Sequence, residues 1–456
     1  MNSPIDTAVP DVPSEKSPAA QPPRTRLAIS VAGAAILLVL GRFPIPIFDL
    51  DLVRDTPYFK PETFSLVALS VQPFVSAALF IEFLALAIPS WRPLRIGGPE
   101  ARAVLWRKVI KLGPLLAFVQ GIGVARYTQS VHVHLLAPGI PALLFVAAVL
   151  TFGSCVLAWL AGVISRHGLG NGYAVLIVAT GAAEFVDWLY EAQLGPTPQM
   201  GFVLAAVAIF LVMRRRSPFA DDAPEQLQLR RPASGLVPTA WVASLFAIHA
   251  FIAGRPVLRG IPLDGVEIAA ILLVPTGALL AWLFNQPSRV AEVWSRLSGS
   301  EGREQVERRL SKLLPREAAI SVVLLWGVLF FAYYAVIESH LDFYFKNALL
   351  VVFAMDLASE WRARSRHSLV SVWPIHRLYA VDAALLALAR AGIPAHPRSV
   401  YFRSLQSFFA PHVPIEILVP EERAAEAAEV LQPLLIGPGE ANIMKAAPSA
   451  AEGVSA

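Results

Sequence analysis

Long apolar runs constrain this chain more than any other feature. A helix needs roughly twenty apolar residues to cross a bilayer, and inside lipid its backbone groups must be satisfied within the segment. The runs therefore predict membrane-spanning helices rather than strands. Only 16% of the residues are charged, against about a quarter in soluble domains. We place ten spans at 27–46, 64–89, 110–128, 139–165, 172–192, 198–213, 234–254, 266–285, 317–338 and 345–360.

Basic residues gather in alternate loops between these runs. They follow the second, sixth, eighth and tenth segments, whereas 129–138 and 193–197 contain neither lysine nor arginine. Cytoplasmic loops carry an excess of Lys and Arg, so this bias predicts that both termini lie in the cytoplasm. An even number of spans agrees with that orientation. The lone Cys155 excludes an internal disulfide, and it is expected to be a buried small residue.

The two ends of the chain have a different composition. Residues 1–25 are rich in Pro, Ser and Ala without apolar periodicity, and 438–456 resemble them, so both are expected to be disordered tails. Residues 366–437 alternate apolar and polar in "SLVSVW", then show helical spacing in "YAVDAALLALARAGI", a strand in "PIEILVP" and a final helix. This pattern predicts a small soluble α+β domain, large enough for its own core.

Motifs along the membrane part resemble the SecY family of protein translocase channel subunits, in the family's order. They are "LGRFPIPIFDLDL" (40–52), "LSVQPFVSAALFIEFLALAIP" (69–89), "AFVQGIG" (117–123), "ISRHGLGNGYAVLI" (164–177), "RRPASGLVPTAWVASLF" (230–246) and "LLVVFAMDLASEWRARSRH" (349–367). The fourth is the most specific. The resemblance implies ten helices over 26–361, in two inverted five-helix halves of about 26–197 and 198–361, around an hourglass pore. Unfolded polypeptide would cross this pore or leave it sideways into lipid. Residues 366–437 loosely resemble a small bacterial signal-transducing domain.

Carried onto this sequence, the resemblance implies five groups of site residues. An apolar pore ring, which would hold ions back by dewetting, comprises Val75, Leu79, Tyr173, Ile177, Ala240 and Ala354. A plug would comprise Phe48, Asp49, Leu50, Asp51, Leu52 and Val53. The lateral gate would comprise Ser76, Glu82, Gln120 and Ser244, with a Glu82–Gln120 contact as a hypothesis. A pore-mouth turn would comprise Gly168, Gly170, Asn171 and Gly172, and a docking surface Arg214, Arg215, Arg216 and Arg303.

Each of these groups also has a simpler interpretation. The ring residues are equally typical of ordinary helix packing, and the plug residues of an external loop. Asn171 is a common helix cap, and the docking arginines could simply set topology. Two ring positions are alanine where the family favours isoleucine, which predicts a wider neck. The docking loops 214–231 and 286–316 are reduced, and the second lacks the P-G-I-R-P-G pattern of the family.

Ionisable residues inside membrane segments are functional candidates, and here they are Glu82, Glu184, Asp187 and Asp356. The sequence shows no enzyme site, metal-ligand spacing, cofactor motif or nucleic-acid patch. The resemblance implies SecE-like and SecG-like membrane subunits, an unfolded preprotein, and a SecA-like ATPase or the ribosome as partners, in a bacterial inner membrane. Two other interpretations stay open: a SecY fold with a specialised or accessory role, and a small-solute secondary transporter. The transporter would need buried midplane charges.

Overall fold

The computed structural model describes residues 22–48, 64–91, 94, 99–131, 136, 139–191, 207, 210–211, 216–218, 228–230, 275, 279, 282, 285–298, 303–336, 341–405 and 413–436. The expected sites at Asp49–Val53, Arg214, Arg215, Ala240 and Ser244 lie outside these residues. Helices account for most of the described chain, and the strands are confined to two small antiparallel sheets.

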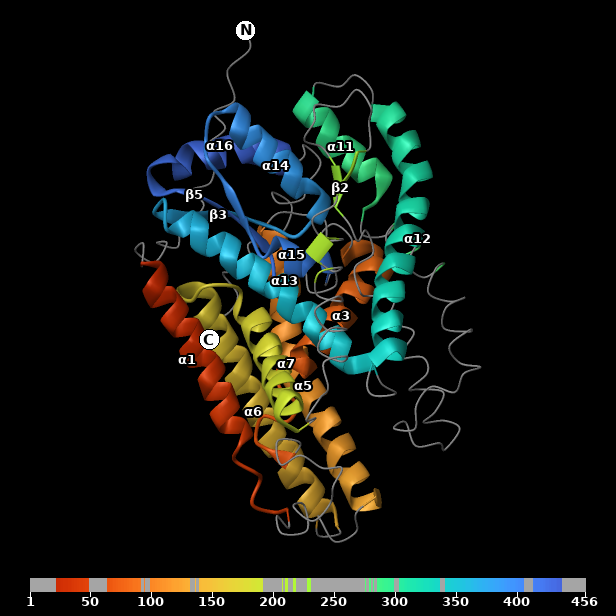
Figure 1. Cartoon of the computed structure of the whole chain (residues 1–456), viewed down its shortest axis with the longest axis vertical. Coiled ribbons are helices and arrows are strands. Elements are labelled where there is room, and N and C mark those ends of the chain that lie inside the picture. The colour runs from red at the N-terminus through yellow and green to blue at the C-terminus, as the bar shows by residue number, and fades with distance from the viewer. Residues whose placement is uncertain are drawn as a thin grey trace.

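Five helices form the bundle in the lower part of Figure 1. They are α1 (Pro23–Gly41), α3 (Gln72–Ala87), α5 (Pro99–Val131), α6 (Ile140–His167) and α7 (Gly172–Glu191). Among the described residues, three helical segments are long and apolar enough to cross a membrane: Pro23–Gly41, Arg102–Arg126 and Ile140–His167. The count of ten spans stays a prediction.

Three helix boundaries differ from the expected ones for local reasons. The first helix ends at Gly41 rather than at 46, because Pro44 and Pro46 lack the amide protons that a helix needs. The second begins only at Gln72, since residues 66–71 form turns and Ser70 has a φ of 49°. In contrast, α5 starts about a dozen residues before the expected 110, since a helix continues through polar residues once it has formed.

The later part of the chain contributes β1 (Arg216–Pro218) and β2 (Gln228–Arg230), which pair antiparallel, then α11 (Pro287–Ser298), α12 (Arg303–Val336) and α13 (Leu341–Arg364). The stretch 286–316 is therefore not the loop that the sequence suggested, because α11 and the first half of α12 make most of it helical. Val290, Ala291 and Trp294 of α11 pack against Leu310 and Leu314 of α12, and this packing stabilises both helices.

The C-terminal residues fold as a three-stranded antiparallel sheet with helices. The elements are β3 (Leu369–Ile375), α14 (Leu378–Arg390), β4 (His396–Arg398), α15 (Val400–Leu405), β5 (Ile415–Pro420) and α16 (Ala424–Leu435), with strand order β3-β5-β4. The residues between α14 and β4 include Gly392, whose φ of 67° lets the chain reverse there. β3, α14, β5 and α16 lie where "SLVSVW", "YAVDAALLALARAGI", "PIEILVP" and the final helix were expected, whereas β4 and α15 were not expected.

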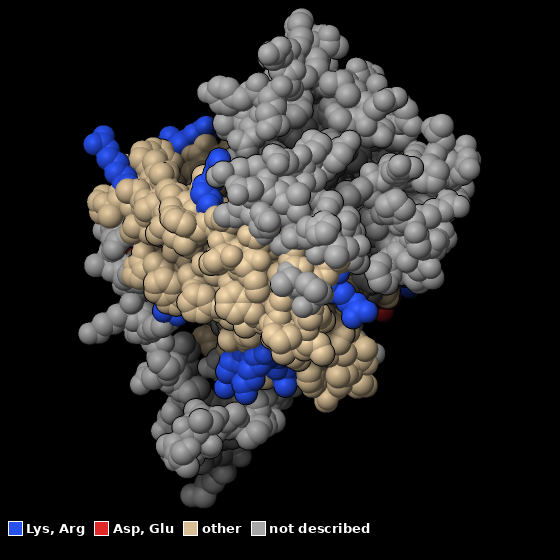
Figure 2. Space-filling view, turned by 90° about the horizontal axis from the view of Figure 1, so that it is seen from below, with Lys and Arg blue, Asp and Glu red and all other residues tan. Residues whose placement is uncertain are grey.

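The C-terminal sheet with α14 and α16 lies above the bundle, beside α11, and α13 runs between the two (Figure 1). Seen from the opposite end, most of the described surface carries neither acidic nor basic side chains, and the Lys and Arg side chains form separate groups (Figure 2). Large apolar side chains such as Val39, Leu115, Phe152 and Trp159 are more than half exposed on α1, α5 and α6. Such exposure suits helices whose outer faces contact lipid.

Candidate functional site

Three of the expected pore-ring residues meet in one apolar cluster. Val75 of α3 and Tyr173 of α7 are each 4% exposed, and Ile177 packs against them with Val352 and Phe353 of α13. Helices that are distant in sequence therefore contribute to this cluster, as a constriction built from several helices requires. Whether these side chains form a pore seal stays a prediction.

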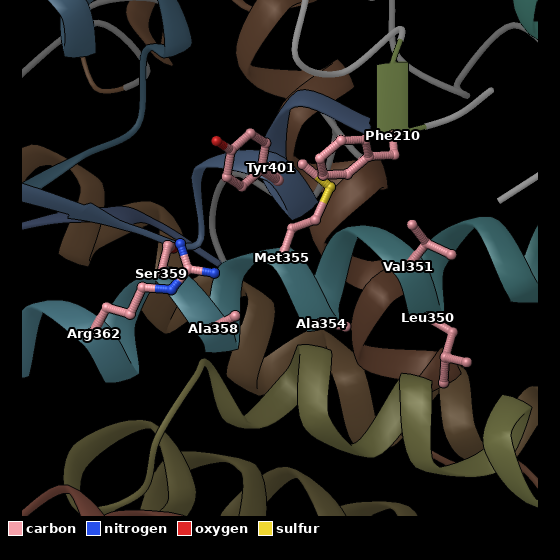
Figure 3. A pocket seen from close by; sticks show the side chains of 9 residues that line it. All are labelled: Phe210, Leu350, Val351, Ala354, Met355, Ala358, Ser359, Arg362 and Tyr401. Carbon is pink, nitrogen blue, oxygen red and sulfur yellow. The ribbon is translucent and has the colours of Figure 1, made fainter. Parts of the chain in front are cut away.

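The remaining described ring residues lie elsewhere. Leu79 is half-buried on α3, and Ala354 of α13 is exposed. Ala354 borders a cavity of about 750 Å³, lined by Phe210, Leu350, Val351, Ala354, Met355, Ala358, Ser359, Arg362 and Tyr401. Met355 projects from α13 toward Phe210 and Tyr401 (Figure 3). The small side chain of Ala354 therefore borders this cavity, and its place in a pore ring with a wider neck stays a prediction.

The turn at residues 168–172, called the mouth turn below, joins α6 to α7. Gly170 has a φ of 77°, a conformation that favours glycine. The side chain of Asn171 caps α7, since its Oδ1 accepts hydrogen bonds from the backbone N–H groups of Tyr173 (3.0 Å) and Ala174 (3.5 Å). The expected turn and cap are therefore both present.

Gly172 lets α7 approach α6 closely. A Cβ atom at this position would lie 2.6 Å from the carbonyl carbon of Ala161, which is shorter than real Cβ contacts. The Gly172 N–H donates to Ser165 Oγ (2.8 Å), and Ser165 Oγ donates to the Ala161 carbonyl (2.8 Å). These two hydrogen bonds therefore join the start of α7 to α6 at the point where the two helices approach closely.

Residues from α1 hold the other side of the mouth turn. Ser30 Oγ accepts the Leu169 N–H at 2.8 Å and lies 2.7 Å from the Leu169 carbonyl oxygen. The guanidinium of Arg26 donates to the carbonyl oxygen of Gly168 (3.3 Å). Both side chains are 5% exposed. The polar backbone of the turn is therefore satisfied inside the protein rather than by water.

A buried cluster of charges connects the mouth turn to α13 and to β4. Glu360 of α13 is 1% exposed and accepts the Gly170 N–H (2.9 Å). It also pairs with Arg364 Nε (2.7 Å) and Arg398 Nε (3.2 Å). Removing one partner of a buried ion pair typically costs about 3–5 kcal/mol, because the other charge stays buried.

Arg398 of β4 makes most of the contacts in this cluster. Its guanidinium donates to Glu416 of β5 (2.9 Å), to the Ser165 carbonyl (3.1 Å), and to the carbonyls of Gly168 and Gly170. Burial by itself disfavours the charged form, but the carboxylates of Glu360 and Glu416 outweigh burial and hold the pKa of Arg398 above its ordinary value. Arg398 therefore stays charged at any physiological pH.

The expected lateral-gate residues pair differently from the hypothesis. The hypothesis joined Glu82 to Gln120, but the Gln120 side-chain amide donates to Ser76 Oγ (3.4 Å). Glu82 forms an ion pair with Arg102 near the start of α5, with side chains 12% and 7% exposed. The reason is position along the helices: Arg102 lies opposite Glu82, and Ser76 lies nearer to Gln120.

The expected plug and docking residues are only partly described. Phe48 is 5% exposed, forms a β-bridge with Leu136, and contacts the Phe64 ring with centroids 4.9 Å apart. Arg216 begins β1, and Arg303 is exposed at the start of α12. These positions leave the plug and docking assignments as predictions.

Sequence reasoning missed Glu360, Arg398, Arg26 and Ser30. Glu360 and Arg364 are four residues apart at the end of α13, a spacing that indicates an ion pair on one helix face. No local pattern marks Arg398, whose backbone carbonyl partners lie more than 200 residues away in the chain. Within the described residues, no group of three or more His, Cys, Asp or Glu side chains could hold a metal ion.

A family model and curated relatives point to one family. The family model described as SecY matches residues 65–356. The protein translocase subunit SecY of Streptococcus gordonii is 27% identical over 312 residues, which cover 58% of this chain and 72% of that protein. The subunit of Thermotoga maritima is 28% identical over 153 residues, covering 33% of this chain and 36% of the relative. A solved structure of the SecY protein, described as addressing its plug domain and membrane seal, has a TM-score of 0.49 at 15% identity, covering 75% of this chain and 93% of the other.

Proposed function

Because this chain belongs to the SecY family, whose model matches residues 65–356, we propose that it is the channel subunit through which unfolded polypeptides cross or enter the membrane. The family match carries this proposal. The matched range includes the mouth turn, the expected ring residues and Asp356, so the similarity covers the parts of the chain on which a channel would depend.

The arrangement of the described side chains supports a gated path along the bundle. Val75, Tyr173 and Ile177 come from two helices and pack with α13 in a single apolar cluster. A narrow apolar neck can exclude ions, because water leaves it and an ion cannot shed its hydration shell there. A flexible neck of this kind can still admit an extended polypeptide once the helices part.

The finer features of the proposal follow from the family and from the charge pattern. They are ten spans in two inverted halves, both termini in the cytoplasm of a bacterium, and the mouth turn at the cytoplasmic end. SecE-like and SecG-like subunits would accompany the chain. We propose that it performs no catalysis itself, so that a SecA-like ATPase or the ribosome would supply the driving force.

Site-specific crosslinking tests the path directly. The full chain carrying Cys155→Ser and Val75→Cys, together with its co-purifying subunits, is challenged in membranes with a preprotein whose folded C-terminal fusion stalls it in transit. We expect the stalled preprotein to crosslink at position 75. Phe80 lies on the same helix but is 52% exposed on another face, so Phe80→Cys is the matched control and should crosslink far less.

Equal crosslinking at positions 75 and 80 would count against a channel function. So would the absence of crosslinking at both positions, if the same preprotein stalls in the host's own translocase. Mass spectrometry of the same purified complex tests the partners. A SecE-like single-span subunit is the expected finding, and a complex without it would favour the specialised role.

A further inference from the structure

The short helix α15 of the C-terminal part is built into the core of the membrane bundle. Its sequence, "VYFRSL", places Phe402 and Leu405 on one side of the helix, and both side chains are fully buried. They belong to the same apolar cluster as Val75 and Tyr173. A soluble segment therefore supplies part of the core that lines the expected path.

The bundle holds the start of α15 through Asp356 of α13. The carboxylate of Asp356 accepts the backbone N–H groups of Tyr401 (3.0 Å) and Phe402 (2.7 Å), and the residue is 4% exposed. Hydrogen bonds to an ionised acceptor are among the stronger ones in proteins. This buried acid thus has a defined task, which is to fix α15 against α13.

Arg398, two residues before α15, fastens the same segment to the mouth turn. Its guanidinium reaches the carbonyls of Gly168 and Gly170 and pairs with Glu360, and both charged side chains are almost completely buried. Such a contact forms only when β4 lies directly on the turn. The hydrogen-bonding groups of the turn are then occupied by this chain itself.

Arg403 adds a further buried charge to this segment. The guanidinium of Arg403 is 2% exposed and donates to the His376 carbonyl (3.1 Å). Burial and the neighbouring charge of Arg102 lower the pKa of Arg403 to about 9, partly offset by Glu82. The Glu82–Arg102 pair of α3 and α5 is therefore next to α15. The segment 396–405 therefore contacts both α13 and the mouth turn, and its Phe402 shares an apolar cluster with Val75 of α3.

We propose that residues 396–405, called the cap below, close the mouth of this channel in the resting state, with Arg398 and Asp356 as its latches. This inference rests on the proposed function. A polypeptide entering past the mouth turn toward Val75 and Tyr173 must displace Phe402 and Leu405, since these side chains fill the same cluster. Opening then requires the C-terminal part to swing away, as a bound partner could induce.

The cap can be tested in the full chain reconstituted in phospholipid vesicles. In a Cys155→Ser background, Leu405→Cys reports release of the cap through its rate of labelling by a water-soluble maleimide, and efflux of entrapped chloride reports an open path. We expect Arg398→Met to raise both rates at least tenfold. Arg423→Met is the matched control, because Arg423 forms an exposed pair with Glu426 in the same C-terminal part, and it should change neither rate.

Asp356→Asn provides a second variant, should Arg398→Met not yield a monodisperse protein. It keeps the side-chain volume and weakens the two bonds to α15, so both rates should rise. Faster labelling without chloride efflux would show that the cap does not close the path. Unchanged labelling in both variants would show that these residues do not hold it. A failure of the proposed function itself would look different: labelling and efflux rise together, yet no stalled preprotein crosslinks at position 75.

Discussion

The close approach of α6 and α7 makes Gly172 the most sensitive position of the mouth turn. In Gly172→Ala, the new Cβ would lie 2.6 Å from the carbonyl carbon of Ala161 and 2.8 Å from its Cα. Ordinary contacts begin near 3.4 Å, so the two helices must separate locally by about 1 Å. The obstructing atoms belong to backbone rather than to a flexible side chain, so no rotamer change relieves the contact.

The expected cost follows from two sources. Overpacking of this kind costs about 1–3 kcal/mol. Separation also stretches the hydrogen bonds from Gly172 to Ser165 and from Ser165 to Ala161, each worth about 1 kcal/mol. We therefore expect a loss of roughly 2–5 kcal/mol, which lowers the melting temperature of a chain of this size by about 2–5 °C.

Gly162 offers a control in α6 itself. A Cβ at Gly162 meets no atom within 4 Å, so Gly162→Ala gains helix propensity, about 0.5–1 kcal/mol, without a clash. The melting temperatures of both variants and of the parent, measured in the same detergent, show whether the added Cβ at position 172 clashes. If Gly172→Ala melts within 1 °C of the parent or together with Gly162→Ala, the close approach of α6 and α7 is refuted.

Three further predictions concern the polar contacts. Asn171→Ala removes the cap of α7 and should cost about 0.5–2 kcal/mol in thermal unfolding, whereas Asn171→Asp should retain most of the stability; equal losses would contradict a capping role. For Glu82 and Arg102, the double change to leucine should cost about 0.5–3 kcal/mol less than the sum of the single changes, and additive costs would exclude a direct pair. Burial lowers the pKa of His396 below its ordinary 6.5, the carboxylate of Glu360 opposes this and the charge of Arg364 adds to it. Because the pKa of His396 is lowered while the cap is docked, the released cap binds a proton more readily. The docked cap therefore loses stability as the pH falls through about 6.5. The rate of maleimide labelling of Leu405→Cys is divided by the rate for the unfolded chain at the same pH, because fewer thiolates react at lower pH. This ratio should be higher at about pH 5.5 than at about pH 7.5, and His396→Asn should remove that difference.

The local sequence determined many, but not all, of the elements of this protein. Apolar runs of sufficient length force helices in lipid, which is why α1, α5 and α6 were foreseeable from composition alone. β3, α14, β5 and α16 followed from periodicity, whereas β4 and α15 did not, and the role of Asn171 followed from the chemistry of helix caps. The family resemblance located the mouth turn, because the backbone conformation of this turn requires glycines, and these glycines are visible in the sequence.

Only the tertiary structure decided how these elements contact one another. Asp356 was recognisable as an acid inside a membrane segment, yet its partners are backbone N–H groups of α15, and backbone groups have no sequence signature. Arg398 looked like any surface arginine, because its burial comes from residues that are far away in the chain. Glu82 pairs with Arg102 rather than with Gln120, because the relative position of α3 and α5 places Arg102 beside it. Long-range pairing of charges depends on packing, and packing arises only once the helices have assembled.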